Sequence, residues 1–318
     1  MPETARQHKK PKQKIYLESR YRKLVRGLPQ TIFWCPTCKG DRRRRQNCEK
    51  CEGFGKLTKT SVQELIGRRM LPAFQAKTGS FHGAGREDVD VLMLGRGRPF
   101  VYEVVGARKF DVDLEALRNE IVERAEGAIE LDPFVPVQRA RVAYWKQTNF
   151  DKVYRVEVVC DEPPADLSKA QSFAGIITQR TPQRVAHRRA DLERERQVEV
   201  LSLEKLEDLR LQLRVQCQHG TYVKEWVSSD GGRTEPSLSS LLGVVCQCDQ
   251  LDVEDVLTDQ PSASSDSGVV GAQSSALPAL GCEGSRGVEP APALSYGQPG
   301  TEESIGCRRI VRSRGLGA

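Results

Sequence analysis

The stretch His82-Gly-Ala-Gly-Arg-Glu-Asp-Val-Asp-Val91 indicates both the fold and a candidate site. Its two glycines allow backbone angles closed to other residues, and they let a flat ligand approach closely. Apolar residues alternate with others from Val89 to Leu94, which predicts a β-strand. We therefore expect Asp88 at the start of a strand. The Gly-Arg-x-Asp sequence of residues 85–88 also suits a surface turn with a solvated carboxylate.

Positive charge is concentrated at the start of the chain. The formal net charge is +6, but residues 1–70 contain 19 Lys/Arg against 6 Asp/Glu, whereas residues 71–260 contain 25 against 32. Such a concentration favours a polyanionic partner, and nucleic acid is the commonest polyanion inside cells. A solvated basic tail that aids solubility is the alternative interpretation.

The lengths of the apolar runs and the number of cysteines indicate the cellular compartment of the protein. No stretch approaches the about 20 apolar residues of a membrane span, and the N-terminus lacks the apolar run of a signal peptide. Ten cysteines in 318 residues are too few for a disulfide scaffold, and four of them form CxxC pairs. We therefore expect an intracellular protein of the cytoplasm and/or nucleus, with a metal site and no membrane partner.

The two CxxC pairs, Cys35-Pro-Thr-Cys38 and Cys48-Glu-Lys-Cys51, are separated by nine residues. Each pair can bend two thiolates onto one ion, and together they complete a tetrahedral Zn²⁺ site with no open position for catalysis. We predict a structural zinc in preference to an iron–sulfur cluster, which usually has other spacings, or a redox pair. Arg42–Arg45 between the pairs are expected to contact phosphate.

Strand and helix patterns alternate without a regular βαβ repeat, which predicts an α+β fold. Helices are expected over 15–27, over 62–70 after a capping box at Ser61, from the cap Asp113 onward, and over 238–243. Strands are expected over 88–105 as a hairpin turning at 95–99, over 135–143, over 153–160, and over 213–227 as two pieces around Gly220. The run 203–211 suits either type, and 251–257 is a final element.

Several segments in a fixed order resemble a known family. They are the Asp88 loop, Lys152-Val-Tyr154-Arg-Val, Gln179-Arg-Thr-Pro-Gln-Arg-Val-Ala-His-Arg-Arg-Ala-Asp191, Gly220-Thr-Tyr-Val-Lys224 and Leu251-Asp-Val, preceded by Arg20-Tyr-Arg-Lys-Leu and Leu28-Pro-Gln-Thr. Over about residues 18–257 the chain resembles the archaeal and eukaryotic tRNA pseudouridine synthases that modify uridines 54 and 55 of the T-arm.

The resemblance implies the pseudouridine synthase fold, a mixed and mostly antiparallel sheet with flanking helices and an RNA-binding cleft. It implies an isomerase that acts on the tRNA T-loop at position 55 and/or 54, as a monomer and without an organic cofactor. An active-site aspartate attacks a flipped-out uridine, the glycosidic bond breaks, the base rotates and a C–C bond forms.

The family pattern assigns the catalytic roles to three residues. By this match Asp88 is the nucleophile, Lys224 is the cation that pairs with it, and Tyr154 stacks on the base and takes a proton. Asp90 is the main rival nucleophile. Without the match, Tyr154 suits the core of a sheet, and Lys224 suits an exposed pair with Glu225.

Substrate contacts follow from the same match. Val223 and Leu251 are expected to wall the pocket, and Arg86 is a second candidate for the cation beside the nucleophile. Arg180 and Arg184 are expected to contact phosphate, although they also suit a solvated face.

Charge, cysteine spacing and composition, together with the resemblance, predict four parts of the chain. They are a basic N-terminal segment (1–32), a zinc-binding cysteine module (33–60), a catalytic domain (61–257) and a disordered tail (258–318), in which Ser, Gly, Ala and Pro dominate.

Departures from the family pattern leave other functions open. The family's THUMP-containing accessory domain has no counterpart in this chain, Leu92 stands where the family usually has arginine, and Arg42–Arg45 spread the cysteine pairs apart. The alternative is therefore a catalytically weak or inactive RNA-binding protein of the same fold. A cysteine-rich chaperone module is a third interpretation, because Cys48–Gly55 fits CxxCxGxG, but only one clean copy is present.

Overall fold

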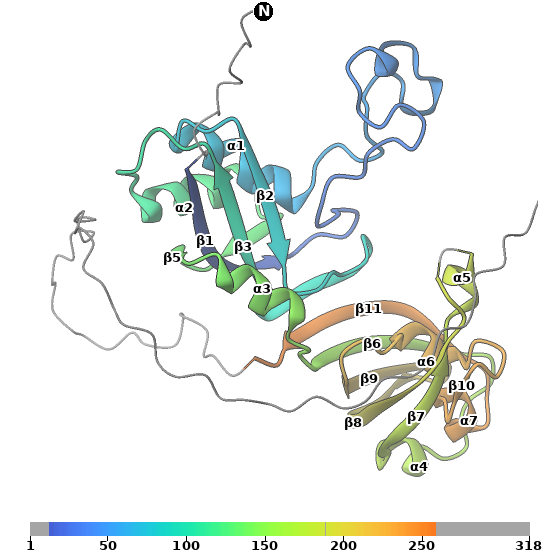
Figure 1. Ribbon diagram of the computed structural model, residues 1–318. Helices are drawn as coiled ribbons and strands as arrows, with labels where there is room; N and C mark the ends of the chain where they lie inside the picture. The colour runs from blue at the N-terminus through green and yellow to red at the C-terminus, as the bar shows by residue number, and fades with distance from the viewer. Residues whose placement is uncertain (1–12, 188, 259–318) are drawn as a thin grey trace, which may run out of the picture. The chain divides into compact units, whose positions relative to one another are not determined.

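The structure, a computed structural model, describes residues 13–187 and 189–258 (Figure 1). The predicted disordered tail beyond residue 258 and the first twelve residues lie outside this part of the chain. No helix within the described residues is long and apolar enough to cross a membrane.

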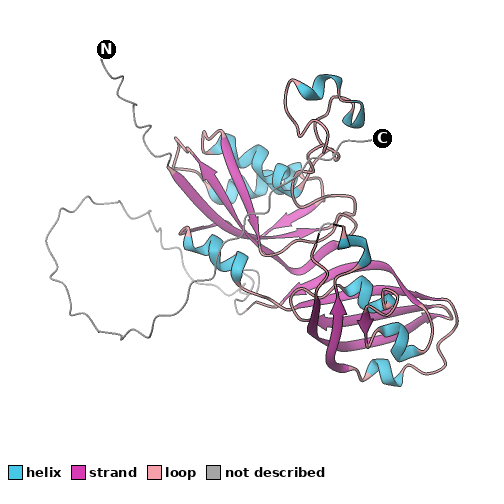
Figure 2. Ribbon diagram, turned by 45° about the vertical axis from the view of Figure 1, so that its right-hand side comes forward, coloured by secondary structure: helices cyan, strands magenta, loops and turns pink. Residues whose placement is uncertain are grey.

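Eleven strands and seven α-helices make up the described fold (Figure 2). The strands are β1 (Lys14–Lys23), β2 (Thr78–Gly83), β3 (Leu92–Val105), β4 (Ile129–Leu131), β5 (Val135–Val137), β6 (Lys152–Cys160), β7 (Ala174–Arg180), β8 (Glu193–Glu207), β9 (Arg210–Cys217), β10 (Thr234–Glu235) and β11 (Cys246–Val256). The helices are α1 (Val62–Ala73), α2 (Leu114–Arg124), α3 (Ala140–Gln147), α4 (Ser168–Gln171), α5 (Gln183–Ala186), α6 (Val223–Ser228) and α7 (Leu238–Leu242), with the 3₁₀ helices η1 (Arg44–Asn47) and η2 (Glu49–Cys51).

All eleven strands belong to one sheet. Its order is β10-β7-β8-β9-β6-β11-β3-β1-β4, with β2 paired to β3 and β5 paired to β1. Every pairing is antiparallel except that of β11 with β3, where Asp252 lies beside Leu92. The predicted α+β class, with a mixed and mostly antiparallel sheet, is confirmed.

Two hydrophobic cores lie along this sheet. The first packs β1 and β3 against α1 and α2, with Ile66, Phe100 and Ile121 among its buried side chains. The second packs β6 to β9 against α6 and α7 around Trp226. Helices α1 and α2 lie on one face of β1–β3 and α3 on the other (Figures 1 and 2). Tyr154 packs against both cores, so it marks the place where they meet.

The predicted helix over 15–27 is wrong, because residues 14–23 form β1 in the interior of the sheet. Leu17, Ser19, Tyr21 and Lys23 are buried at alternate positions, and Arg20 between them is buried as well. A serine and a lysine at buried positions hid this period of two in the sequence. The domain limits stay predictions, although the sheet includes part of the expected N-terminal segment.

The predicted hairpin at 95–99 is also wrong, because residues 92–105 form one strand, β3. The pairing of β1 with β3 jumps between Tyr21 and Lys23, which leaves an irregular stretch of β3 around Gly95. Gly95 has φ +54°, and a Cβ there would lie 2.1 Å from the Glu254 carbonyl oxygen. The glycine therefore allows two backbones to approach where β3 passes from β11 to β1.

Local signals predicted the other elements with mixed success. Ser61 caps α1, Asp113 caps α2, and α7 and β6 lie where they were expected. The expected strand over 135–143 is the short β5 followed by α3, and the second piece of 213–227 is helix α6. The ambiguous run 203–211 is strand, from β8 into β9, and 251–257 falls mostly within β11.

Substitution of Gly95 by alanine should destabilise the fold by about 3 kcal/mol, the sum of a positive-φ penalty and overpacking. The control is Gly127→Ala, since Gly127 has φ +78° and nothing within 4 Å of the added Cβ. It should cost only about 1 kcal/mol. Urea unfolding measures both, and equal losses would contradict the close approach at Gly95.

Candidate active site

The loop between β2 and β3 presents Asp88 to solvent. Asp88 is exposed, whereas its neighbour Glu87 is buried. Within the described residues, no hydrogen bond or ion pair is found for the Asp88 carboxylate. A reactive carboxylate needs this combination of a free oxygen and a fixed backbone.

A buried ion pair fixes the start of this loop. The Arg98 guanidinium lies 2.8 Å from the Glu87 carboxylate, and the two side chains are 1% and 0% exposed. The Tyr21 hydroxyl donates to the same carboxylate at 2.8 Å, and Arg98 donates to the Ala84 carbonyl at 2.8 Å. Burial opposes the charge of Arg98, but Glu87 raises the pKa of Arg98 above its usual value. Two paired charges thus tie the loop to β1 and β3.

Lys23 holds the backbone that follows the Asp88 side chain. Its ammonium is fully buried and donates to the carbonyls of Leu28, Asp88 and Val89 at 2.8, 3.0 and 3.2 Å. Burial lowers the pKa of Lys23, while the charge of Glu87 opposes that shift. The Asp88 peptide is therefore clamped while its side chain stays free.

Lys224 faces the loop from α6, but it pairs with a different carboxylate from the one expected. Its ammonium lies 2.8 Å from the Asp90 carboxylate. Partial burial alone would raise the pKa of Asp90, but the hydrogen bond and charge of Lys224 lower the pKa below its usual value. Lys224 therefore contacts the loop through Asp90, and among the described residues the Asp88 carboxylate has no ion-pair partner.

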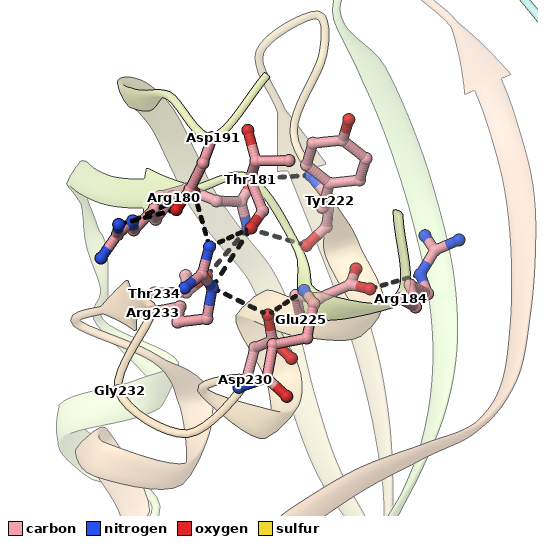
Figure 3. Close-up of polar contacts among 12 residues, drawn as sticks. Arg180, Thr181, Arg184, Asp191, Tyr222, Glu225, Asp230, Gly232, Arg233 and Thr234 are labelled. Atoms are coloured by element: carbon pink, nitrogen blue, oxygen red, sulfur yellow. Dashed lines mark hydrogen bonds and ion pairs between the residues drawn. The ribbon is translucent and has the colours of Figure 1, made fainter. Parts of the chain in front are cut away.

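Arg184 supplies a second cation beside Asp88. It pairs with the buried Glu225 of α6, as Figure 3 shows, and its guanidinium lies 5.9 Å from the centre of the Tyr222 ring. The hydrogen bond to Glu225 raises the pKa of Arg184, and the charge of Asp88 adds to the rise. Arg184 therefore lies close enough to Asp88 for their charges to interact.

Arg180 belongs to a separate cluster. It forms an ion pair of 2.6 Å with Asp191, which also binds Arg233 at 2.6 Å. Arg233 donates to the Thr181 carbonyl at 2.6 Å as well. Figure 3 shows this cluster on the other side of Glu225 from Arg184, so the structure does not bring Arg180 to Asp88.

Of the two residues expected to wall the pocket, Leu251 lies with Tyr154 at the junction of the two cores, and Val223 does not. Tyr154 and Leu251 are partly exposed and pack against both cores, whereas Val223 is buried in the second. Burial raises the pKa of Tyr154, although the charge of Arg98 opposes this rise. Tyr154 is therefore a neutral phenol close to the residue that anchors the Asp88 loop.

Arg86 does not pair with Asp88. Its guanidinium lies 4.9 Å from the centre of the Phe33 ring, at the start of the cysteine module. This contact links the module to the Asp88 loop, and the ion pair of Lys56 with Glu64 links the module to α1.

Sequence reasoning gave no role to the residues that position the loop. Tyr21, Lys23 and Gln30 lie in the two front segments of the family pattern, and that was the only available signal. Gln30 donates to the Tyr21 hydroxyl at 2.8 Å and to the Gly85 carbonyl at 3.0 Å. The hairpin predicted at 95–99 includes Arg98, which the structure instead buries in β3 against Glu87.

The four cysteines of the module come together as expected. The thiol sulfurs of Cys35, Cys38, Cys48 and Cys51 are all buried and lie within 4.8 Å of one another. The Cys35–Cys48 and Cys38–Cys51 separations are 3.7 and 3.6 Å. A tetrahedral ion with Zn–S bonds of about 2.3 Å requires sulfurs about 3.8 Å apart. The group can therefore hold a metal ion.

Comparison with known proteins gives a consistent set of relatives. The family described as "Pus10, C-terminal" matches residues 16–257. The "tRNA pseudouridine synthase Pus10" of Methanothrix thermoacetophila is 43% identical over 247 residues, which are 77% of this chain and 54% of that protein. The protein of the same name from Methanothermobacter marburgensis is 45% identical over 249 residues, 76% of this chain and 60% of that one. The chain thus spans little more than half the length of these curated relatives.

Solved structures show only a weak similarity. The "Crystal Structure of a Cbf5-Nop10-Gar1 Complex" matches with a TM-score of 0.36 and 17% identity, over 61% of this chain and 45% of that one.

Removal of one partner of the buried pair should be costly. Arg98→Met leaves the Glu87 charge buried and unpaired, so the free energy of unfolding should fall by about 3–5 kcal/mol. Lys205→Met serves as the control, because Lys205 is half exposed in its pair with Asp208, and such pairs contribute about 1 kcal/mol or less. Denaturant unfolding that gave the two variants similar losses would contradict the role of the pair.

Proposed function

The chain belongs to the family described as Pus10, C-terminal, and from this premise we propose that it is a tRNA pseudouridine synthase. It isomerises uridine in the T-loop, at position 55 and/or 54, and Asp88 is the attacking group. The observation that carries this proposal is an exposed carboxylate with no side-chain partner among the described residues, on a loop whose backbone Lys23 holds and whose neighbouring Asp90 binds Lys224.

The geometry supports Asp88 over Asp90 as the nucleophile. Asp90 already accepts the Lys224 ammonium, and breaking that pair would cost interaction energy at the moment of attack. Attack by Asp88 breaks no such pair, because its carboxylate has no hydrogen bond or ion pair among the described residues.

The reaction is balanced within the substrate. The Asp88 carboxylate attacks C1′ of a flipped-out uridine, so a C1′–O bond forms as the C1′–N1 bond breaks. The base then turns, and the C1′–C5 bond forms as the C1′–O bond breaks and releases the carboxylate. C5 loses one proton and N1 gains one, so no organic cofactor is consumed. Because burial raises the pKa of Tyr154, we assign its neutral ring to stacking and its hydroxyl to hydrogen bonding. Val223 and Leu251 line the apolar side of the pocket for the base.

The metal of the cysteine module is proposed to be Zn²⁺. Four thiolates at tetrahedral separation suit this ion, and a closed site of this kind supports the fold and adds no step to the reaction. The partner is the tRNA T-arm, and we propose that the protein acts as a monomer inside the cell, in the cytoplasm and/or nucleus. Arg184 contacts RNA phosphate in this proposal, and Arg180 does so only if Asp191 releases it.

The Asp88→Asn variant keeps the size of the side chain and removes the nucleophile. Pseudouridine mapping on an unmodified tRNA transcript should show T-loop product with the wild type and a rate at least about 10³-fold lower with the variant. Binding of the transcript should be nearly unchanged, since Asp88 contributes no positive charge.

Asp90→Asn is the matched control. It should lose about 10-fold or less, because an ion pair that solvent reaches contributes about 1 kcal/mol. Equal losses in both variants would contradict the assignment of Asp88. A wild type that binds tRNA without forming product would support the inactive RNA-binding alternative.

Removal of the metal should unfold the cysteine module alone. Cys35→Ser should lower the bound zinc from one ion per chain to less than about 0.1, because the loss of one of four ligands weakens a structural site severely. Metal analysis by mass spectrometry and Co²⁺ substitution, which gives visible bands for a tetrahedral thiolate site, measure this. Cys248→Ser is the control, and iron in place of zinc would contradict the proposal.

A further inference from the structure

The cysteine module has an exposed aromatic surface that the proposed reaction does not use. Trp34 and Phe54 are 56% and 50% exposed, and Leu57 beside them is 51% exposed. The other two tryptophans, Trp145 and Trp226, are 2% and 0% exposed. Scattered apolar residues are normal on a surface, but a tryptophan and a phenylalanine on one small module indicate a binding surface.

The module supports the Trp34 ring from one side. Cys35 and Leu57 pair with Gly55 and Phe33 through backbone hydrogen bonds, so Trp34 lies on a two-stranded ladder. A Cβ on Gly40 would lie 2.3 Å from the Trp34 ring, which shows that the indole packs directly on the Gly40 backbone. With that side covered, the exposed part of the ring is available to a flat partner.

Positive charge lies next to this ring. A Cβ on Gly55 would lie 3.3 Å from the Gly40 Cα and 3.4 Å from the Arg45 side chain, so the indole, the two glycines and Arg45 are contiguous. Arg42–Arg45 are all exposed, and within the described residues none of them forms an ion pair. Residues 33–60 contain eight Lys/Arg against three Asp/Glu.

These four arginines differ from the others expected to contact phosphate. Arg180 and Arg184 are held by Asp191 and Glu225, so binding a phosphate there competes with an existing partner. Among the described residues Arg42–Arg45 form no ion pair, and the only acidic group whose pKa their charge lowers is the exposed Asp41, beside Arg44. A flat aromatic ring beside free guanidinium groups is the arrangement that recognises a base with its phosphates in single-stranded nucleic acid.

The surface lies on a module that contacts the Asp88 loop. Phe33 lies one residue before Trp34, and the Arg86 guanidinium lies 4.9 Å from the centre of the Phe33 ring. The backbone of residues 62 and 63 bonds to that of residues 29 and 30, which closes the base of the module. An RNA that places a uridine at Asp88 therefore passes close to the start of this module.

We propose that the cysteine module binds an unpaired nucleotide of the RNA, by stacking its base on Trp34 while Arg42–Arg45 contact the adjoining phosphates. This inference rests on the proposed function for the RNA as partner. The base must be unpaired and unstacked, because both of its faces are covered inside a duplex.

Tryptophan fluorescence tests the stacking directly, because Trp34 is the only exposed tryptophan of the three. Titration of the zinc-loaded full chain with a single-stranded oligouridylate should quench the emission, and a duplex RNA of equal length should not. Trp34→Phe should remove the quenching and retain affinity. Quenching that is equal with duplex, or absent with both RNAs, would overturn the proposal.

Affinity provides the second readout. Trp34→Ala should weaken binding of the oligouridylate about 10-fold, the loss typical of one stacked base. Phe110→Ala is the control, since Phe110 is an exposed aromatic outside the module, and it should leave affinity unchanged. Serine at Arg42–Arg45 should lower the slope of log affinity against log salt by about 3, at about 0.7 for each phosphate contact. Unchanged affinity in Trp34→Ala would overturn the proposal.

Failure of this inference differs from failure of the proposed function. Quenching by oligouridylate, with no pseudouridine formed on tRNA, would support the stacking surface and contradict the enzyme. Pseudouridine formed at the wild-type rate and affinity by Trp34→Ala would support the enzyme and overturn the stacking surface.

Discussion

The buried ion pair between Glu87 and Arg98 is the constraint on which the proposed site depends. Two charges removed from water are tolerated only when they are paired and hydrogen-bonded, so this pair permits essentially one arrangement of the loop that carries it. Glu87 directly precedes Asp88 in the chain, and its burial therefore turns the next side chain toward solvent. Lys23 adds a third buried charge, which holds the Asp88 peptide by its carbonyl.

The site also depends on the one parallel pairing in the sheet. Strand β11 joins β3 to β6, so it connects the half of the fold that holds the Asp88 loop to the half that holds α5 and α6. Arg184 and Lys224 come from the second half. Tyr154 lies where the two cores meet. An attacking group from one half can thus face cations from the other, an arrangement that suits a substrate lying across the junction.

The parts of the fold that depend on neighbouring residues were predictable from the sequence, and the parts that depend on distant ones were not. Ser61 and Asp113 cap helices through their own backbone neighbours, so their pattern was sufficient. Strand β1 was missed because its buried face includes Lys23, whose partners are carbonyls of other segments. The family resemblance assigned Lys224 to Asp88, but the structure pairs it with Asp90, because that contact depends on where each carboxylate points.

The single-turnover rate of pseudouridine formation by Arg98→Lys, at a temperature where the variant is folded, tests most directly whether this buried pair presents Asp88 for attack. Lysine retains the charge but loses the fork that joins Glu87 to the Ala84 carbonyl, so the loop should shift slightly. Because a displacement of about 1 Å can cost about 10²-fold in rate, the account predicts a fall of that order with tRNA affinity unchanged. A wild-type rate in the folded variant would contradict it.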